Sequence, residues 1–369
     1  MRIFSEGDLA EAVRGAAGPL RIRGGGTRDV GRPVTGAVLD VSGLSGIGLY
    51  EPGALTIVAG AGTPLVEVEA ALAAEGQRLA FEPADWRGLL GRGGEPTLGG
   101  MVAANVSGPR RVQAGACRDA LLGVRFVDGT GAVVKSGGRV MKNVTGYDLV
   151  KLMAGSWGTL GVLTEVALKV LPAPESVAVL VLEGLDDGAA LAAITAALGS
   201  PYDVTGAAHG ASGTLIRIEG FAQSVTYRGE RLAALLSRFG AVRIEADAPV
   251  CRDLWRGVRE VAAFQAVPGD VWRLSVRPSE APGLVARAGA RAVLYDWGGG
   301  LVWLLMPEGE DLRARLGLFS GHATLVRASA ETRARIAPFH PEPAPLAAIS
   351  AGLRARFDPR GILNPGLMG

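Results

Sequence analysis

The hydrophobic positions of the first 172 residues form short runs that glycine-rich turns interrupt. The sequence Asp128-Gly-Thr-Gly131 between two of these runs is typical of a hairpin turn. A helix is predicted over residues 66–74, where a proline precedes and a glycine follows the apolar positions. The runs themselves are short and rich in β-branched residues, so they predict strands at residues 20–23, 55–59, 121–127, 132–135 and 161–171.

The pattern changes after Pro172-Ala-Pro174, which marks the best candidate for a domain boundary. Beyond it, strands alternate with longer amphipathic helices, as in an α+β domain. One helix carries Leu232, Leu235, Leu236 and Phe239 at the i, i+3, i+4, i+7 spacing of a single face. Further elements are predicted as helices over 186–198 and 223–239, and as strands near 177–182, 214–219, 272–276, 291–297, 301–306 and 323–328.

The remaining residues predict one more amphipathic helix, with Leu346, Ile349, Leu353 and Phe357 on one face, followed by a turn-rich ending. We therefore expect three parts: a first domain of residues 1–172, an α+β domain of residues 175–330, and a C-terminal segment of residues 331–369.

Composition narrows the class of protein. The 369 residues are 48% hydrophobic, and 38 basic against 36 acidic residues leave a net charge of +2. This balance does not suggest nucleic-acid binding, and no run of 18 apolar residues predicts insertion into a membrane. The first residues lack the apolar core of a signal peptide, so we expect a cytoplasmic protein, or one held at the inner membrane only through a partner.

Metal chemistry finds no support in the sequence. The cysteines are only Cys117 and Cys251, and the histidines are His209, His322 and His340. None of them forms a pair with metal-ligand spacing, so no metal site is expected.

Glycine-rich segments are the main candidates for ligand binding. Arg23-Gly24-Gly25-Gly26-Thr27 follows a predicted strand, and successive backbone N–H groups in such a turn can bind a pyrophosphate. Thr97-Leu-Gly99-Gly100 continues through Asn105 to Gly108, and small residues there would let a flat ligand lie against the backbone. Gly158-Thr159-Leu-Gly161-Val162 opens another strand. Each segment alone is equally compatible with an ordinary turn.

A rival reading rests on Gly60-Ala-Gly62, which lies between a predicted strand and helix as in a dinucleotide-binding Rossmann fold. Leu65 replaces the third glycine of that fingerprint, and Gln77-Arg78 stand where an acidic residue is expected. The match is therefore weak.

Taken in order, these segments resemble the FAD-linked oxidase, or vanillyl-alcohol-oxidase, superfamily. The resemblance covers residues 1–172 and returns at Asp358–Gly366. More narrowly, six stretches resemble the family of FAD-binding E subunits of bacterial glycolate oxidases: Thr97–Arg111, Val140–Asp148, Leu160–Pro172, Trp272–Ser275, Asp296–Gly299 and Gly321–Thr324. The resemblance implies a PCMH-type FAD-binding domain with two α/β subdomains, plus a smaller α+β cap or substrate domain.

The resemblance also implies site residues. Gly24, Gly25, Gly26 and Thr27 would hold the FAD pyrophosphate beside Arg23, and Asn364 would return near the flavin ring. Thr97, Gly99, Gly100, Asn105 and Gly108 would lie along the flavin and ribityl chain. Gly158, Thr159, Gly161 and Val162 would form a second wall of the cofactor site.

Two departures from the family pattern matter. Covalently flavinylated relatives often have histidine where this chain has Thr27, so non-covalent FAD is expected. Relatives that oxidise D-2-hydroxy acids carry a histidine-containing stretch for metal and base chemistry, for which the surroundings of His209 are a poor substitute.

Oxidation of a 2-hydroxy acid needs a cation for the carboxylate and a base for the hydroxyl proton. Arg273 and Arg277 alternate along one predicted strand and can face one side, where guanidinium groups would bind a carboxylate. His322 is the candidate base. A solvent-facing arginine and a structural histidine are the simpler alternatives.

Two functions remain open. The chain can be the subunit that oxidises glycolate or a similar small 2-hydroxy acid at FAD. It can instead be a flavin-bearing electron-transfer or assembly subunit, with substrate chemistry on a paralogous partner; a stand-alone FAD-linked oxidoreductase is the outside alternative. The resemblance implies a larger FAD-linked oxidase subunit and an iron–sulfur subunit as partners.

Overall fold

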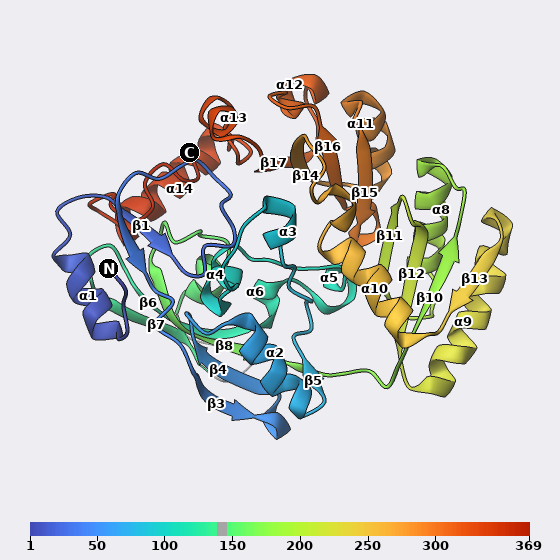
Figure 1. The fold of residues 1–369 in the computed structure, drawn as a ribbon, viewed down its shortest axis with the longest axis horizontal. Coiled ribbons are helices and arrows are strands. Elements are labelled where there is room, and N and C mark those ends of the chain that lie inside the picture. Colours follow the sequence, from blue (N-terminus) through green and yellow to red (C-terminus); the bar gives the residue numbers. More distant parts are fainter. Residues whose placement is uncertain (139–145) are drawn as a thin grey trace.

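The computed structural model describes residues 1–138 and 146–369. Figure 1 shows two layered parts, with the N-terminal elements gathered on one side and a large sheet with its helices on the other. Of the stretches that carry the family resemblance, Val140–Asp148 lies mostly outside the described residues.

The N-terminal domain is built on an antiparallel sheet in the order β3-β4-β8-β6-β7. Its strands are β3 (Ile47–Glu51), β4 (Thr56–Gly60), β8 (Val162–Lys169), β6 (Leu121–Val127) and β7 (Val133–Gly137). A parallel pair, β1 (Leu20–Arg23) and β2 (Ala37–Asp40), lies beside it, and β5 (Gln77–Arg78) pairs with β9 (Leu171–Pro172). The helices of this part are α1 (Glu6–Arg14), α2 (Leu65–Ala74), α3 (Arg87–Leu90), α4 (Leu98–Ala103), α5 (Arg111–Ala114), α6 (Cys117–Ala120) and α7 (Leu149–Met153).

The second part is an eight-stranded sheet in the order β13-β10-β12-β11-β15-β16-β14-β17, which we call the cap sheet. Its strands are β10 (Ser176–Leu182), β11 (Val204–Gly210), β12 (Gly213–Gly220), β13 (Val242–Glu245), β14 (Asp270–Val276), β15 (Ala292–Asp296), β16 (Leu301–Met306) and β17 (Gly321–Arg327). The accompanying helices are α8 (Asp187–Leu198), α9 (Ala222–Leu236), α10 (Ala248–Arg259), α11 (Ala281–Ala288) and α12 (Leu312–Leu316).

The two faces of the cap sheet have different partners because side chains alternate along each strand. Leu274 and Val302 lie in a core with residues of α8, α9 and α11. Leu301 and Trp303, on the opposite face, belong to the core of the N-terminal domain, where Trp303 packs edge-on against Trp86 at 5.8 Å between ring centroids. The cap sheet therefore lies with one face on the N-terminal domain and the other under its own helices.

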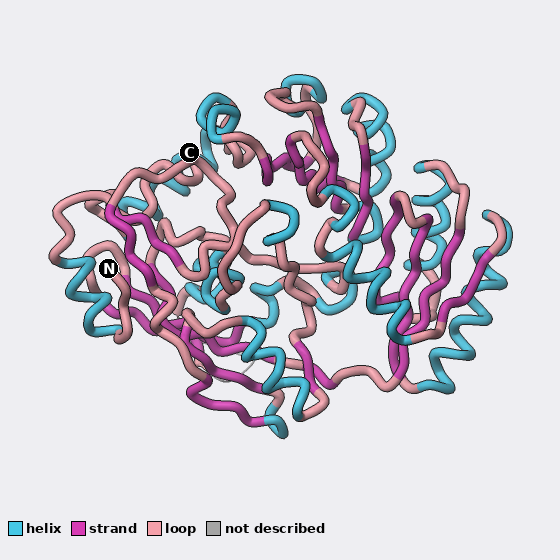
Figure 2. The backbone as a smooth tube through the Cα atoms, viewed as in Figure 1, coloured by secondary structure: helices cyan, strands magenta, loops and turns pink. Residues whose placement is uncertain are grey.

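The C-terminal segment returns to the N-terminal domain after α13 (Ala330–Arg335) and α14 (Ala344–Phe357). Figure 2 shows this last stretch as a loop beside the strand pair near the N-terminus. Leu363 forms a parallel bridge with Leu20, and the backbone N–H of Leu20 donates to the Ile362 carbonyl at 2.7 Å. Residues far apart in the sequence thus share one edge of β1.

Most predicted strands are confirmed, including β1 and β6 at their predicted bounds. Elements that the sequence did not predict include β3, β11, β13, α10 and α11. The Rossmann reading is wrong, because β4 lies antiparallel to both β3 and β8. The predicted apolar face of α14 is only half used: Leu353 and Phe357 pack on the core, whereas Leu346 and Ile349 are 54% and 61% exposed. Within the described ranges, none of the helices combines the length and apolar character needed to cross a bilayer.

Candidate functional site

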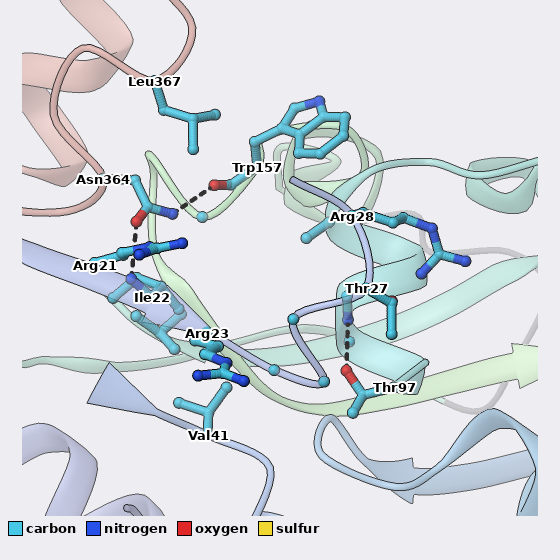
Figure 3. Close-up of a pocket in the computed structure, with 18 of the residues that line it drawn as sticks. Arg21, Ile22, Arg23, Thr27, Arg28, Val41, Thr97, Trp157, Asn364 and Leu367 are labelled. Atoms are coloured by element: carbon cyan, nitrogen blue, oxygen red, sulfur yellow. Dashed lines mark hydrogen bonds between the residues drawn. The ribbon is translucent and has the colours of Figure 1, made fainter. Parts of the chain in front are cut away.

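A cavity of about 350 Å³ opens where β1, α4, β8 and the C-terminal segment meet. Figure 3 shows side chains from β1, the N-cap of α4, the loop before β8 and the C-terminal segment around it. Twelve of the fifteen residues that the family resemblance assigned to the cofactor line this one cavity: Arg23, Gly24, Gly25, Gly26, Thr27, Thr97, Gly99, Gly100, Gly158, Gly161, Val162 and Asn364.

The first glycine turn has no room for side chains. A Cβ on Gly25 would lie 1.6 Å from the Glu95 carbonyl oxygen, and a Cβ on Gly24 would lie 2.5 Å from Thr97 Oγ1. Gly26 has a φ of +69°, which favours glycine. The turn is therefore pressed against residues 95–97, which joins the first and second glycine segments into one wall.

The second segment begins α4. Thr97 is the N-cap of this helix, and its Oγ1 accepts a hydrogen bond from the backbone N–H of Gly100 at 3.3 Å. A Cβ on Gly99 would lie 2.6 Å from the Cβ of Ala61, so the glycine permits close packing of the helix on the turn after β4. Ala61 lines the cavity as well.

Three predicted cofactor residues lie outside the lining of the cavity. The Oδ1 of Asn105 accepts from the backbone N–H of Arg118 at 3.1 Å. The carbonyl of Gly108 accepts from the Trp297 indole N–H at 2.9 Å, and Thr159 Oγ1 donates to the Ser156 carbonyl at 2.7 Å. These contacts give the three residues structural roles that their position in the glycine segments did not reveal.

The third wall combines the start of β8 with the C-terminal segment. Asn364 Oδ1 accepts from the backbone N–H of Ile22 at 2.8 Å, and its Nδ2 donates to the Trp157 carbonyl at 2.9 Å (Figure 3). Trp157 also lines the cavity, with φ at +53°. The side chain of Asn364 is thereby fixed between β1 and the loop that precedes β8.

Arginines give the cavity its charge, and only Arg23 among them was expected from the sequence. Arg21, Arg23, Arg28, Arg32 and Arg92 line the cavity together with a single carboxylate, Asp29. That carboxylate is already paired with Arg92 and with Arg333, at 2.5 Å and 3.3 Å. Burial, partly offset by Asp85, lowers the pKa of Arg28 to about 10. The surplus of guanidinium groups around a glycine turn fits the pyrophosphate of a dinucleotide.

The lining contains neither histidine nor cysteine, the side chains to which a flavin is usually attached. Within the described part of the chain, no group of three or more His, Cys, Asp or Glu side chains is placed to hold a metal ion. His209 lies on β11, with Nδ1 3.0 Å from Thr214 Oγ1 and Nε2 3.5 Å from Asp187.

The structure separates the two arginines that were expected to act together. Arg273 lies on β14, on the face of the cap sheet that carries Trp303, its register partner. Arg277 lies beyond the end of β14, is exposed, and pairs with Glu280 at 3.2 Å. The expectation that both face one side is wrong because the strand ends at Val276 and the chain turns into a 3-10 helix.

His322 shares the face of Arg273. In the register of β14 and β17, His322 pairs with Ser275 and Thr324 pairs with Arg273, so all four residues lie on one side of the sheet. Partial burial and the positive charges of Arg273, His340 and Arg111 lower the pKa of His322. The imidazole is therefore mostly neutral at pH 7 and able to accept a proton.

The face that carries Arg273 and His322 is connected to the cavity by an aromatic contact and a hydrogen bond. Trp157, which lines the cavity, packs edge-on against Phe339 at 5.5 Å. The next residue, His340, accepts a hydrogen bond at Nδ1 from the backbone N–H of Ala323, beside His322.

Comparisons with known proteins agree with this geometry. A family model for the FAD binding domain matches residues 2–137. A solved structure of alkyldihydroxyacetonephosphate synthase superposes with a TM-score of 0.70, covering 99% of this chain and 76% of that one at 16% identity, and so shows the same fold. D-lactate dehydrogenase of Anaerostipes hadrus is 48% identical over 93 residues, a quarter of this chain and a fifth of that enzyme.

The glycolate oxidase subunit GlcE of Escherichia coli K12 is similar over almost its whole length, with 39% identity over 353 residues that cover 95% of this chain and 92% of the relative. The chain is an FAD-dependent oxidoreductase with a PCMH-type FAD-binding domain and an α+β cap, and it belongs to the GlcE family of glycolate oxidase subunits within the FAD-linked oxidases.

Proposed function

We propose that this chain binds one FAD without a covalent link, in the cavity formed by β1, α4, the start of β8 and the C-terminal segment. The observation that carries the proposal is the meeting of three separate glycine segments and five arginines on one cavity. The glycine turn and the arginines would hold the pyrophosphate, while Gly158, Gly161, Val162 and Asn364 would line the opposite wall. The absence of histidine and cysteine from the lining supports a non-covalent complex.

The activity that fits this site is oxidation of glycolate, or a similar small 2-hydroxy acid, to the 2-oxo acid. Bound FAD would supply the acceptor for the hydride. Arg273 is suited to bind the substrate carboxylate, and His322 to take the hydroxyl proton, because both lie on the cap face that covers the N-terminal domain. The names of its relatives, a glycolate oxidase subunit and D-lactate dehydrogenases, support this class of substrate.

The names of these relatives also support a role for the chain as one subunit of a larger complex. A glycolate oxidase subunit GlcD of Bacillus subtilis is 41% identical over 80 residues, which makes a larger paralogous flavoprotein a natural partner. We include an iron–sulfur subunit as the carrier of the electrons, because the two cysteines Cys117 and Cys251 are too few to hold a cluster in this chain. We place the protein in the cytoplasm, free or at the inner membrane through these partners, with domains at residues 1–172, 175–330 and 331–369.

A second function, electron transfer or assembly beside a substrate-oxidising partner, is favoured by two observations. The described residues hold no cluster of metal ligands, and the sequence lacks the histidine-containing stretch of relatives that oxidise D-2-hydroxy acids. Without a positioned base, proton removal is slower by about 10²–10⁴-fold.

Anaerobic addition of glycolate to the isolated, FAD-loaded chain separates the two functions. If the chain oxidises substrate, the visible flavin band disappears within seconds. If it only relays electrons, the band persists until the partner flavoprotein is added. A chain purified with free FAD that retains none after gel filtration would overturn the FAD proposal itself.

A further inference from the structure

Trp297 joins the cap to the N-terminal domain. Its indole N–H donates to the Gly108 carbonyl at 2.9 Å, and Asp296 Oδ1 accepts its backbone N–H at 2.7 Å. Trp297 has a φ of +52°, in the left-handed region that residues other than glycine rarely adopt. Such a conformation persists only where the surroundings enforce it, and it often marks a functional position.

Two guanidinium groups lie over this one indole. The Arg111 guanidinium carbon is 4.3 Å from the Trp297 ring centroid, and that of Arg273 is 4.9 Å from it. Arg111 begins α5 in the N-terminal domain, whereas Arg273 comes from β14 of the cap sheet. Each domain therefore contributes one cation to the same aromatic ring.

Neither cation has an acidic partner in the described residues, since no carboxylate oxygen lies within 4.0 Å of either guanidinium. Residues 139–145, Arg-Val-Met-Lys-Asn-Val-Thr, contain no acid. The neighbouring arginines differ sharply: Arg110 pairs with Glu219, and Arg217 pairs with Glu82 at 2.7 Å. The charge of Arg111 also lowers the pKa of Arg273, after the larger effect of burial, so the two guanidinium groups repel one another. Like charges without a carboxylate partner attract an anion.

Asp296 does not act as the acidic partner of Arg111 and Arg273. It is 3% exposed, its Oδ1 accepts the Trp297 N–H, and burial raises its pKa to about 7. Close to neutral pH a large share of this group is therefore uncharged. Arg111, Arg273 and Trp297 are each half-buried, so none of the three residues is sealed in the core.

We propose that Arg111 and Arg273, gathered on the Trp297 indole, form one anion site between the two domains that binds the carboxylate end of a small organic acid. The proposal deepens the proposed function, on which it rests for the identity of the acid, and it adds Arg111 as a carboxylate-binding residue from the N-terminal domain. Because the site takes one arginine from each part, the bound acid ties the cap to the N-terminal domain.

Isothermal titration of oxalate into the FAD-loaded chain tests the site without turnover. Oxalate has the carboxylate of a two-carbon acid but no C–H bond to oxidise. We expect Arg111→Met and Arg273→Met each to weaken oxalate binding by about tenfold or more, the loss typical of a charged hydrogen bond. Arg277→Met removes an exposed arginine near the same strand end, already paired with Glu280, and should leave the affinity unchanged. Oxamide, the uncharged analogue, should not bind.

Arg111→Lys and Arg273→Lys guard against loss by misfolding, since each keeps the charge and should retain intermediate affinity with unchanged thermal unfolding. Unchanged oxalate binding in Arg111→Met, or equal binding of oxamide, would overturn the shared site. Flavin content, measured on the same samples, reports on the FAD proposal separately. Oxalate binding together with a flavin that glycolate never reduces, even with the partner present, would refute the proposed activity but leave the anion site standing.

Discussion

The carboxamide of Asn364 is hydrogen-bonded to the backbone N–H of Ile22 at 2.8 Å, although 342 residues separate them. Its other end donates to the Trp157 carbonyl at 2.9 Å, and the side chain is almost fully buried. One side chain thus ties the C-terminal segment to both β1 and the loop before β8.

Replacing Asn364 with alanine should weaken FAD retention. The change leaves the Ile22 N–H and the Trp157 carbonyl without partners, which typically costs about 1–3 kcal/mol for buried groups. Thermal unfolding and the flavin-to-protein absorbance ratio after gel filtration measure both effects. Ser350→Ala, which removes an exposed hydrogen bond to Glu342, is the control and should change neither. Full flavin content in Asn364→Ala would show that the C-terminal contact does not shape the site.

Gly25→Val should abolish FAD binding. The new side chain would meet the Glu95 carbonyl, so the turn must move away from residues 95–97, and overpacking of this kind typically costs about 1–3 kcal/mol. Flavin content is the readout, with circular dichroism to confirm that the chain is folded. Gly18→Ala meets no heavy atom within 4 Å and should behave like the parent. A folded Gly25→Val that carries its full flavin would contradict the assignment of this turn.

The flavin should be released by acid. Because no histidine or cysteine lines the cavity, precipitation of the holoprotein should leave all the yellow colour in the supernatant. A yellow pellet would mean a covalent link and would require a different residue for it. Heat precipitation serves as the control, since it denatures the protein without cleaving a covalent bond between the flavin and a side chain.

Arg217→Ala should strongly destabilise the chain. Arg217 bridges the cap to the N-terminal domain through two hydrogen bonds to Glu82, at 2.8 Å and 2.7 Å, and its side chain is 4% exposed. Loss of one partner from such a buried pair costs about 3–5 kcal/mol. Arg256→Ala breaks an exposed pair with Asp253 and should cost about 1 kcal/mol at most. Urea unfolding compares the two; similar midpoints would refute the bridging role.

Asp296 should make the protein less stable as the pH rises from about 4 to about 7. Burial raises its folded pKa to about 7 from the ordinary value of 3.8, so the folded chain holds the proton where the unfolded chain has lost it. The contribution of Asp296 to the free energy of unfolding is fully present below the pKa of the unfolded state. It is lost as the pH rises through the pKa of the folded state. Asp296→Asn should show a smaller loss over this interval. Asp253→Asn, at an exposed position, should follow the parent, and identical profiles for all three would disprove the shift.

Local patterns predicted most strands and the cavity wall. Gly24 to Gly26 and Gly158 were recognisable because glycine is required where a turn adopts positive φ or meets another backbone closely. Asn105 and Gly108 sit within the same motif, but their hydrogen bonds go to Arg118 and Trp297, and only tertiary structure reveals such partners.

The charged part of the site was not predictable from the sequence. Arg21 and Arg92 belong to segments without a recognisable motif, and β1 and the chain after α3 bring them to one cavity. Alternation placed Arg273 and Arg277 on one side, but that holds only while a strand continues, and β14 stops between them. Strand β11, Val-Thr-Gly-Ala-Ala-His-Gly, was missed because small residues lack the β-branched pattern, although burial in the cap sheet favours the strand.

The bridge between Leu20 and Leu363 has a consequence for biosynthesis. A growing chain that has emerged from the ribosome up to α12 carries the glycine turn and the arginines, but not Asn364. The C-terminal part of the third wall, with Asn364 and Leu367, is then missing, so the cavity is still open on that side. The complete cavity therefore exists only once the last residues of the chain have been made.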